Sequence, residues 1–296
     1  MRLRRTIYWA NGLALDNLKK AIASDVDAIC MDLEDGILPM NKKACREATA
    51  EVLRTWDFRG KERLVRVNKF GTEYLEEDLA VILPAKPDAL RIPKAEKAED
   101  LLALDARLEK FEKENGMEKN AIEMVLMIET ALGMYRCYEL ASCCERITAV
   151  GIGMEDFTTS MGLEERRYIP GNPDLTYARQ KMVLDCLAAG VQPIDSGVLF
   201  NGNVEYMRED TQIDKYQGFV GRSVGDLAQV DIINEVFAPS QKNVDWAVRV
   251  LSGWEKAMMT GNGDLYVDGK FVDPPVVEKA TAIMERVNMI KARRAR

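Results

Sequence analysis

The segment Ala28-Ile29-Cys30-Met31-Asp32-Leu33-Glu34-Asp35 decides the fold of this chain. Its first part, Ala28–Asp32, is a short and mainly apolar run, which is typical of a buried strand. Acidic residues follow at once, and Asn41–Arg54 then places apolar residues at the 3.6-residue spacing of an amphipathic helix. A strand, a loop and a helix in this order form the repeating unit of a parallel sheet.

The same unit recurs up to about residue 240. Strand-like runs occur at Thr6–Trp9, Ala28–Asp32, Leu64–Val67, Ala89–Ile92, Met124–Ile128, Ile147–Ile152, Gln192–Asp195 and Gly218–Ser223. Helix-like segments between them include Ala14–Ala23, Asn41–Arg54, Lys97–Asn115, Gly133–Ala141, Thr176–Ala189 and Leu227–Phe237. Eight alternating strands predict an α/β protein with a closed (β/α)8 TIM barrel. An open doubly wound sheet is the alternative, but it usually has a GxGxxG turn after its first strand, and Asn11-Gly12 does not match.

The alternation ends near residue 240. Ser240–Met258 has the pattern of a helix, and Asp268-Gly269 between two short apolar runs predicts a hairpin. Asp273-Pro274-Pro275 then opens a last helix to about Ala292. We therefore predict a barrel over residues 1–239 and a helix–hairpin–helix extension over residues 240–296.

Composition narrows the chemistry. The 296 residues include no histidine, which excludes Ser-His-Asp triads, HExxH zinc sites and 2-His-1-carboxylate iron sites. A net charge of −7 disfavours nucleic acid as the main partner. No apolar run reaches the roughly 18 residues of a membrane span, so we expect no membrane segment. The six cysteines form no CxxC pair, so we expect buried free thiols and a cytoplasmic location.

Charged residues stand where the predicted strands end, which is the rim where barrel enzymes build active sites. These ends are Asp32–Asp35, Arg66–Asn68, Arg91–Lys94, Glu129, Gly151–Asp156, Asp195 and Arg222. Glu129 and Asp156 lie one βα unit apart, so their carboxylates can reach one cation. Two carboxylates with waters and substrate oxygens suit Mg²⁺. The alternative is that Glu129 and Asp156 only begin helices.

Two basic rim residues have competing interpretations. Arg66 ends an apolar strand, and its guanidinium can bind a substrate carboxylate or carbonyl through two parallel hydrogen bonds. It can also pair with Glu34 or Asp35, and that pair would orient it for the substrate. Lys94 could form a Schiff base, although a rim lysine is more often a surface or ion-paired residue.

Short motifs in order along the chain carry a family resemblance. They are Met31–Asp35, Arg66–Asn68, Arg91–Lys94, Ile128–Gly133, Gly153–Phe157, Ala178-Arg179, Gly218–Ser223, Ala238–Ser240 and Asp268–Asp273. Together they resemble the citrate lyase β-subunit-like branch of the HpcH/HpaI aldolase superfamily. The resemblance implies a (β/α)8 barrel that assembles as a trimer or hexamer. It also implies Mg²⁺-dependent cleavage or formation of a C–C bond in a β-hydroxy acid or its CoA thioester.

The resemblance also implies roles for residues. Glu129 and Asp156 would be the metal ligands, and Arg66 would bind the substrate beside them. Glu34 and Asp35 would orient Arg66 and metal-bound water. Asp273 matches an aspartate in a C-terminal lid that reaches a neighbouring subunit's site, where it or metal-bound water would take the β-hydroxyl proton. An aspartate before proline is equally typical of a helix N-cap.

The absent histidine separates branches of this superfamily. The pyruvate–aldehyde aldolases of the superfamily use a histidine as base, so the thioester-cleaving branch fits this chain better. Four alternatives remain open: a β subunit of a multi-subunit citrate lyase acting on an acyl-carrier-protein thioester, a 2-keto acid aldolase, a Schiff-base aldolase using Lys94, and a non-catalytic binding protein.

Overall fold

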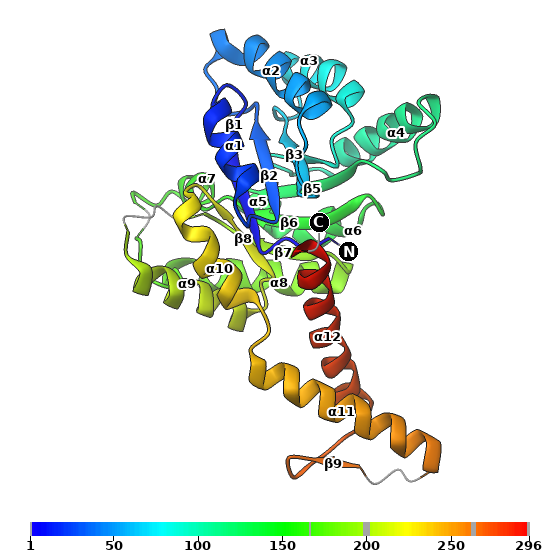
Figure 1. The fold of residues 1–296 in the computed structure, drawn as a ribbon. Coiled ribbons are helices and arrows are strands. Elements are labelled where there is room, and N and C mark those ends of the chain that lie inside the picture. Colours follow the sequence, from blue (N-terminus) through cyan, green and yellow to red (C-terminus); the bar gives the residue numbers. More distant parts are fainter. Residues whose placement is uncertain (1, 166, 198–201, 262–264, 295–296) are drawn as a thin grey trace. The chain divides into compact units, whose positions relative to one another are not determined.

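A computed structural model describes residues 2–165, 167–197, 202–261 and 265–294. Within them the chain divides into two compact units, residues 3–234 and 235–296. The first unit is a closed barrel of eight parallel strands in the order β1 to β8, with β8 pairing back onto β1 (Figure 1). The predicted (β/α)8 TIM barrel is therefore confirmed.

The strands are β1 (Thr6–Asn11), β2 (Ala28–Asp32), β3 (Glu62–Arg66), β4 (Ala89–Ile92), β5 (Glu123–Ile128), β6 (Ile147–Ile152), β7 (Gln192–Asp195) and β8 (Gly221–Val224). The helices of the first unit are α1 (Leu15–Ala23), α2 (Lys42–Thr55), α3 (Glu73–Ile82), α4 (Ala98–Glu114), α5 (Ala131–Tyr135), α6 (Cys137–Ser142), α7 (Met154–Ser160), α8 (Thr176–Ala189) and α9 (Val204–Gln217). The boundary between the two units falls within α10 (Val230–Phe237). Short 3₁₀ segments lie at Pro39–Asn41, Leu83–Ala85, Pro173–Leu175 and Leu227–Gln229.

Side chains of the strands alternate between the barrel interior and the helix layer, because successive strand residues point to opposite faces. The interior holds a buried apolar cluster with Trp9 packed against it: Ile7, Ala28, Cys30, Leu64, Ala89, Val125, Ala149 and Ile194. Two residues further along β2, β3 and β4 stand Asp32, Arg66 and Arg91. The same alternation that fills the core therefore directs charged side chains inward near the carboxyl ends of the strands.

The second unit has its own apolar core. It contains α11 (Gln241–Thr260), the short hairpin strands β9 (Tyr266–Val267) and β10 (Lys270–Phe271), and α12 (Pro274–Arg294). Its buried residues are Ala247, Val250, Val272 and Ala280. These elements match the helix, hairpin and helix expected beyond residue 240.

Some element boundaries differ from prediction. β8 begins at Gly221 rather than Gly218, because Gly218 adopts a left-handed φ of 103° and caps the end of α9. The expected helix over Gly133–Ala141 is split into α5 and α6 at Arg136. No helix of the described residues has the length and apolar character that a membrane crossing requires.

Candidate active site

Asp32 organises the loop at the carboxyl end of β2. Its carboxylate accepts the backbone N–H groups of Glu34 at 3.0 Å and of Gly36 at 3.1 Å. A Cβ added to Gly36 would lie 2.4 Å from Asp32 Oδ2, so only glycine fits the turn at this distance. The loop therefore wraps around Asp32 and brings Glu34 to the barrel mouth.

Arg66 lies beside Asp32 because the two residues are register partners on β3 and β2. Its Nε donates to Asp32 Oδ1 at 2.7 Å and its Nη2 donates to Oδ2 at 2.8 Å. Its Nη1 lies 3.0 Å from Glu34 Oε2. A guanidinium has five N–H groups. The contacts with described residues use three of these groups, so two N–H groups have no acceptor among the described residues. Arg66 is thus held by two carboxylates and keeps donors for a further anion.

Lys94, after β4, lies among acidic side chains. Its Nζ is 2.6 Å from Asp35 Oδ2, 3.4 Å from Glu34 Oε1 and 3.6 Å from Asp156 Oδ1. Burial opposes its charge, but the hydrogen bond to Asp35 and the charges of Glu34 and Asp156 raise the pKa of Lys94. A Schiff-base lysine needs a neutral amine, whose population these contacts suppress. The geometry therefore disfavours the Schiff-base alternative.

Glu129 follows β5 and is 2% exposed. Its Oε2 accepts the backbone N–H of Lys94 at 3.0 Å, with Lys94 at a left-handed φ of 47°. A Cβ on Gly153 would lie 2.7 Å from Glu129 Oε1, so glycine at that position makes room for the carboxylate. Burial raises the pKa of Glu129 to about 7; the charges of Glu34 and Asp156 add to the rise, while Arg66 opposes it.

We expect Glu129 to make the stability of the metal-free protein depend on pH. Between pH 4.5 and about 7 the folded state keeps a proton that the unfolded chain has released. The free energy of unfolding should therefore fall as pH rises through this range, by up to about 3 kcal/mol. Urea unfolding in EDTA at pH 5 and pH 8 measures this difference, and the Glu129→Gln variant should lack it. Equal pH slopes for the variant and the wild-type protein would contradict the assignment.

The donor set fits a divalent cation. Five carboxylates (Asp32, Glu34, Asp35, Glu129 and Asp156) gather around the cations Arg66, Lys94 and Arg91, which leaves an excess of two negative charges when all are ionised. The described residues contain no group of three or more acidic, cysteine or histidine side chains arranged to hold a metal. Mg²⁺ suits this arrangement, because it binds through one or two carboxylates and keeps waters or substrate oxygens as its other ligands.

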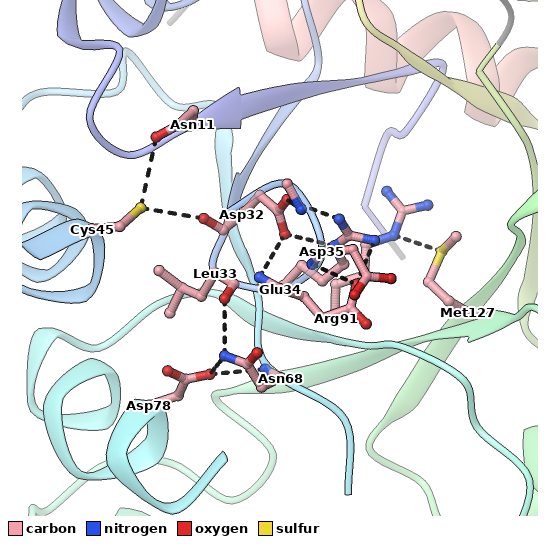
Figure 2. A network of polar contacts seen from close by, with 12 residues as sticks. Asn11, Asp32, Leu33, Glu34, Asp35, Cys45, Asn68, Asp78, Arg91 and Met127 are labelled. Atoms are coloured by element: carbon pink, nitrogen blue, oxygen red, sulfur yellow. Dashed lines mark hydrogen bonds and ion pairs between the residues drawn. The ribbon is translucent and has the colours of Figure 1, made fainter. Parts of the chain in front are cut away.

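The structure brings together five of the six predicted site residues. Arg66, Glu34, Asp35, Glu129 and Asp156 are joined through the contacts of Arg66 and Lys94. The predicted pairing of Arg66 occurs with Glu34, whereas Asp35 pairs with Lys94. Figure 2 shows Asp32, Glu34 and Asp35 grouped at this end of β2, with Arg91 close by.

Asp273 lies in the second unit and is described there. Its Oδ1 accepts the backbone N–H of Val276 at 3.2 Å, and its carbonyl accepts those of Val276 and Val277. It therefore caps the start of α12, as its alternative interpretation predicted. Asp273 also lines a pocket of about 310 Å³ with Trp254, Met258 and Phe271. Its role in a neighbouring subunit stays a prediction.

Sequence reasoning missed the role of Asp32, which forms two hydrogen bonds with Arg66. The signal was present, since Asp32 stands two residues before Glu34 on the same strand end. Two other charged residues of the strands, Asp195 and Arg222, lie outside this carboxylate cluster and are fully buried. They form an ion-pair network with helix residues, namely Arg179 of α8 and Asp210 and Asp214 of α9. This network joins the helix layer to β7 and β8, so these two charges do not add to the rim site.

Comparisons with known proteins show the family to which the chain belongs. Residues 5–226 match the family model described as HpcH/HpaI aldolase/citrate lyase. The chain belongs to this family. Citrate lyase subunit beta of Leuconostoc mesenteroides is 32% identical over 97% of this chain and 94% of the relative. L-malyl-CoA/beta-methylmalyl-CoA lyase of Cereibacter sphaeroides is 30% identical over 93% and 91%.

The fold of this HpcH/HpaI family member also matches solved structures. Protein CitE from Mycobacterium tuberculosis, in complex with magnesium, acetoacetate and coenzyme A, superposes with a TM-score of 0.76. The two chains are 24% identical, and the match covers 96% of this chain and 98% of the Mycobacterium chain. The relatives' names describe carbon–carbon lyases, so the predicted enzyme class and the citrate lyase β-like branch are confirmed.

Proposed function

We propose that the protein is an Mg²⁺-dependent lyase that cleaves or forms a C–C bond in a β-hydroxy acid or its CoA thioester, of the citryl, citramalyl or malyl type. The observation that carries this proposal is the place of the Arg66 guanidinium in the same carboxylate cluster as Glu129 and Asp156. Two of its N–H groups have no acceptor among the described residues. The names of the Leuconostoc relative, a citrate lyase subunit, and of the Cereibacter relative, a malyl-CoA lyase, support this substrate class. The magnesium and coenzyme A bound to the Mycobacterium protein support the cofactor and the carrier.

Each residue has a separate task in the proposed reaction. Glu129 and Asp156 would hold Mg²⁺, which when bound polarises the substrate's oxygens and stabilises developing negative charge. Arg66 donates its remaining N–H groups to the substrate's carboxylate or thioester carbonyl. Asp32 and Glu34 fix the guanidinium, so its donors already point where negative charge develops. Lys94 holds Glu34 and Asp35 in place.

Cleavage requires a base for the β-hydroxyl group. Loss of the hydroxyl proton lets its oxygen form a carbonyl, the Cα–Cβ bond breaks, and its electrons become the enolate of the thioester. Protonation of that enolate completes the products. We propose that Asp273 of a neighbouring subunit takes the proton, in a homotrimer or hexamer where the segment 240–296 closes over the adjacent barrel.

A second candidate is a β subunit of a multi-subunit citrate lyase acting on an acyl-carrier-protein thioester. The 32% identity to the Leuconostoc subunit over nearly the whole chain favours it. Purification from the native host separates the two candidates. A free CoA lyase purifies without an acyl carrier protein, whereas a citrate lyase subunit co-purifies with one.

A substrate panel tests the proposed function. Citramalyl-, malyl- and citryl-CoA and the free hydroxy acids are assayed with Mg²⁺ and again with EDTA. We expect turnover of at least one CoA thioester, its loss in EDTA and its return with added Mg²⁺. Activity that survives EDTA, or borohydride trapping of substrate on Lys94, would refute the metal mechanism. Binding without turnover would favour a non-catalytic protein.

A further inference from the structure

Trp9 of β1 lies against two guanidinium groups in the barrel. Its ring centroid is 4.5 Å from Cζ of Arg66 and 4.4 Å from Cζ of Arg91. A cation within about 6 Å of an aromatic face is attracted by the ring, and a stacked guanidinium is also fixed in orientation. Trp9 itself packs against the apolar cluster of the interior, so it offers a supported surface to both cations.

The two arginines are neighbours by strand register. Arg66 of β3 and Arg91 of β4 are paired residues of adjacent strands, and Asp32 of β2 completes the row. Like charges directly opposite each other in a sheet are destabilising. Arg66 is compensated by Asp32 and Glu34, whereas Arg91 forms no ion pair with any described residue.

Arg91 is an unusual group for a barrel interior. The side chain is 0% exposed. Its Nη2 donates to Ser223 Oγ at 3.0 Å, and its Nε lies 2.8 Å from Met127 Sδ. Its Nη1 has no hydrogen-bond partner in the described part of the chain. Burial lowers the pKa of its guanidinium. Buried charges are normally paired, because an unpaired one costs several kcal/mol. The charge of Glu129 opposes this lowering but does not cancel it, since the pKa of Arg91 stays below its ordinary value. Stability alone therefore gives no reason for arginine here.

Space for this group is built into β6. A Cβ on Gly151 would lie 3.0 Å from Arg91 Nη2 and 3.0 Å from Met127 Sδ, so a larger residue would press on the guanidinium. Trp9, Gly151 and Ser223 thus accommodate Arg91 from three strands. The buried charge of Arg91, which is costly to stability, is therefore surrounded by residues that contact it or leave space for it.

We propose that Trp9 and Arg91 are positioning residues that hold Arg66 in its anion-binding orientation, an inference that rests on the proposed role of Arg66. The Trp9 ring fixes the plane of the Arg66 guanidinium. The charge of Arg91 repels Arg66 toward Asp32 and Glu34, and it adds positive potential for an anionic substrate. Neither residue touches the substrate in this proposal.

The stability and kinetics of three variants test it: Arg91→Met, Arg91→Lys and Trp9→Leu. We expect Arg91→Met to melt at or above the wild-type temperature, because it removes an unpaired buried charge. Its kcat/KM should nevertheless fall about 10²-fold, as misplaced binding groups cause. Arg91→Lys should recover part of the loss, and Trp9→Leu should resemble Arg91→Met.

Arg107→Met is the matched control for charge. Arg107 is 40% exposed on α4 and pairs with Glu76, so its replacement removes one positive charge outside the barrel and should leave kcat/KM within about 2-fold. A lower melting temperature for Arg91→Met with unchanged kcat/KM would show a purely structural role and overturn the proposal.

Binding of malonate separates this proposal from the proposed reaction. A variant with Trp56, Trp246 and Trp254 replaced by phenylalanine leaves Trp9 as the only tryptophan of the chain's four. Its emission should change when malonate and Mg²⁺ bind, and Arg91→Met should raise the malonate Kd at least 10-fold. If both binding results are observed but no thioester is turned over, the proposed lyase activity is refuted and the positioning role of Trp9 and Arg91 is supported. No emission change, or an unaltered Kd in Arg91→Met, overturns the positioning role.

Discussion

Replacement of Glu129 by glutamine should lower kcat/KM at least about 10³-fold, and Asp156→Asn should act in the same way. Both changes remove a negative charge from the cluster that would hold Mg²⁺. Glutamine still offers an oxygen to the backbone N–H of Lys94, which Glu129 accepts at 3.0 Å, so the loop can keep its shape. Steady-state kinetics and calorimetric titration with Mg²⁺ measure the two losses together.

A stability measurement distinguishes the loss of a metal ligand in these variants from a loss of folding. Because burial raises the pKa of Glu129 to about 7, the glutamine variant should be as stable as the wild-type protein at pH 8 or more so. Glu76→Gln is the matched control, since Glu76 is 68% exposed and its partner is the surface residue Arg107. Full activity and unchanged Mg²⁺ affinity in both Glu129→Gln and Asp156→Asn would refute the site.

Replacement of Arg66 by lysine should lower kcat/KM about 10²- to 10³-fold although the charge is kept. An ammonium cannot reproduce the two hydrogen bonds to Asp32, the contact with Glu34 and the donors that remain for substrate. The loss should appear in both KM and kcat, because Arg66 would bind the substrate and also stabilise the charge that develops on it. Kinetics with the best thioester of the panel measure the split.

Arg63→Lys is the matched control for this change. Arg63 lies on the same strand and also forms two hydrogen bonds with an aspartate, Asp88, through Nε at 3.0 Å and Nη2 at 3.1 Å. We expect kcat/KM of Arg63→Lys to stay within about 3-fold of wild type, because the pair lies at the other end of β3. If Arg66→Lys were equally active, Arg66 would not be the anion-binding group.

Prediction of the fold from sequence succeeded where local and tertiary preferences agree. β2, β4, β6 and β7 occupy the predicted residues, because their mainly apolar runs are bounded by loops and are buried in the barrel. α8 also occupies its predicted residues, and it ends before Gly190, which adopts a left-handed φ of 73°. α9 was not predicted, and its composition explains why. Its buried side chains include Asp210, Thr211 and Asp214, so acidic residues interrupt the apolar stripe of the helix. Arg179 of α8 and Arg222 of β8 form ion pairs with those acids in the folded chain.

Prediction of the site from sequence was limited in the same way. Strand ends and the barrel fold place Arg66, Glu129 and Asp156 at one rim, and the resemblance assigns them roles. The contact of Trp9 with Arg66 and Arg91 could not be predicted, since it joins three strands and depends on barrel register. The row formed by Asp32, Arg66 and Arg91 has the same origin.

The sequence by itself determined the alternation of strands and helices, the residue types at the strand ends and the absence of histidine chemistry, because these follow from local periodicity and composition. Only the tertiary structure decided which charges meet. Asp32 and Glu34 hold Arg66, and Lys94 joins Asp35 to Asp156. Arg91 lies against Trp9 and forms no ion pair with a residue that the structure describes. The reason is physical: strand register and burial set the distances between charges, and neither can be read from a strand considered alone.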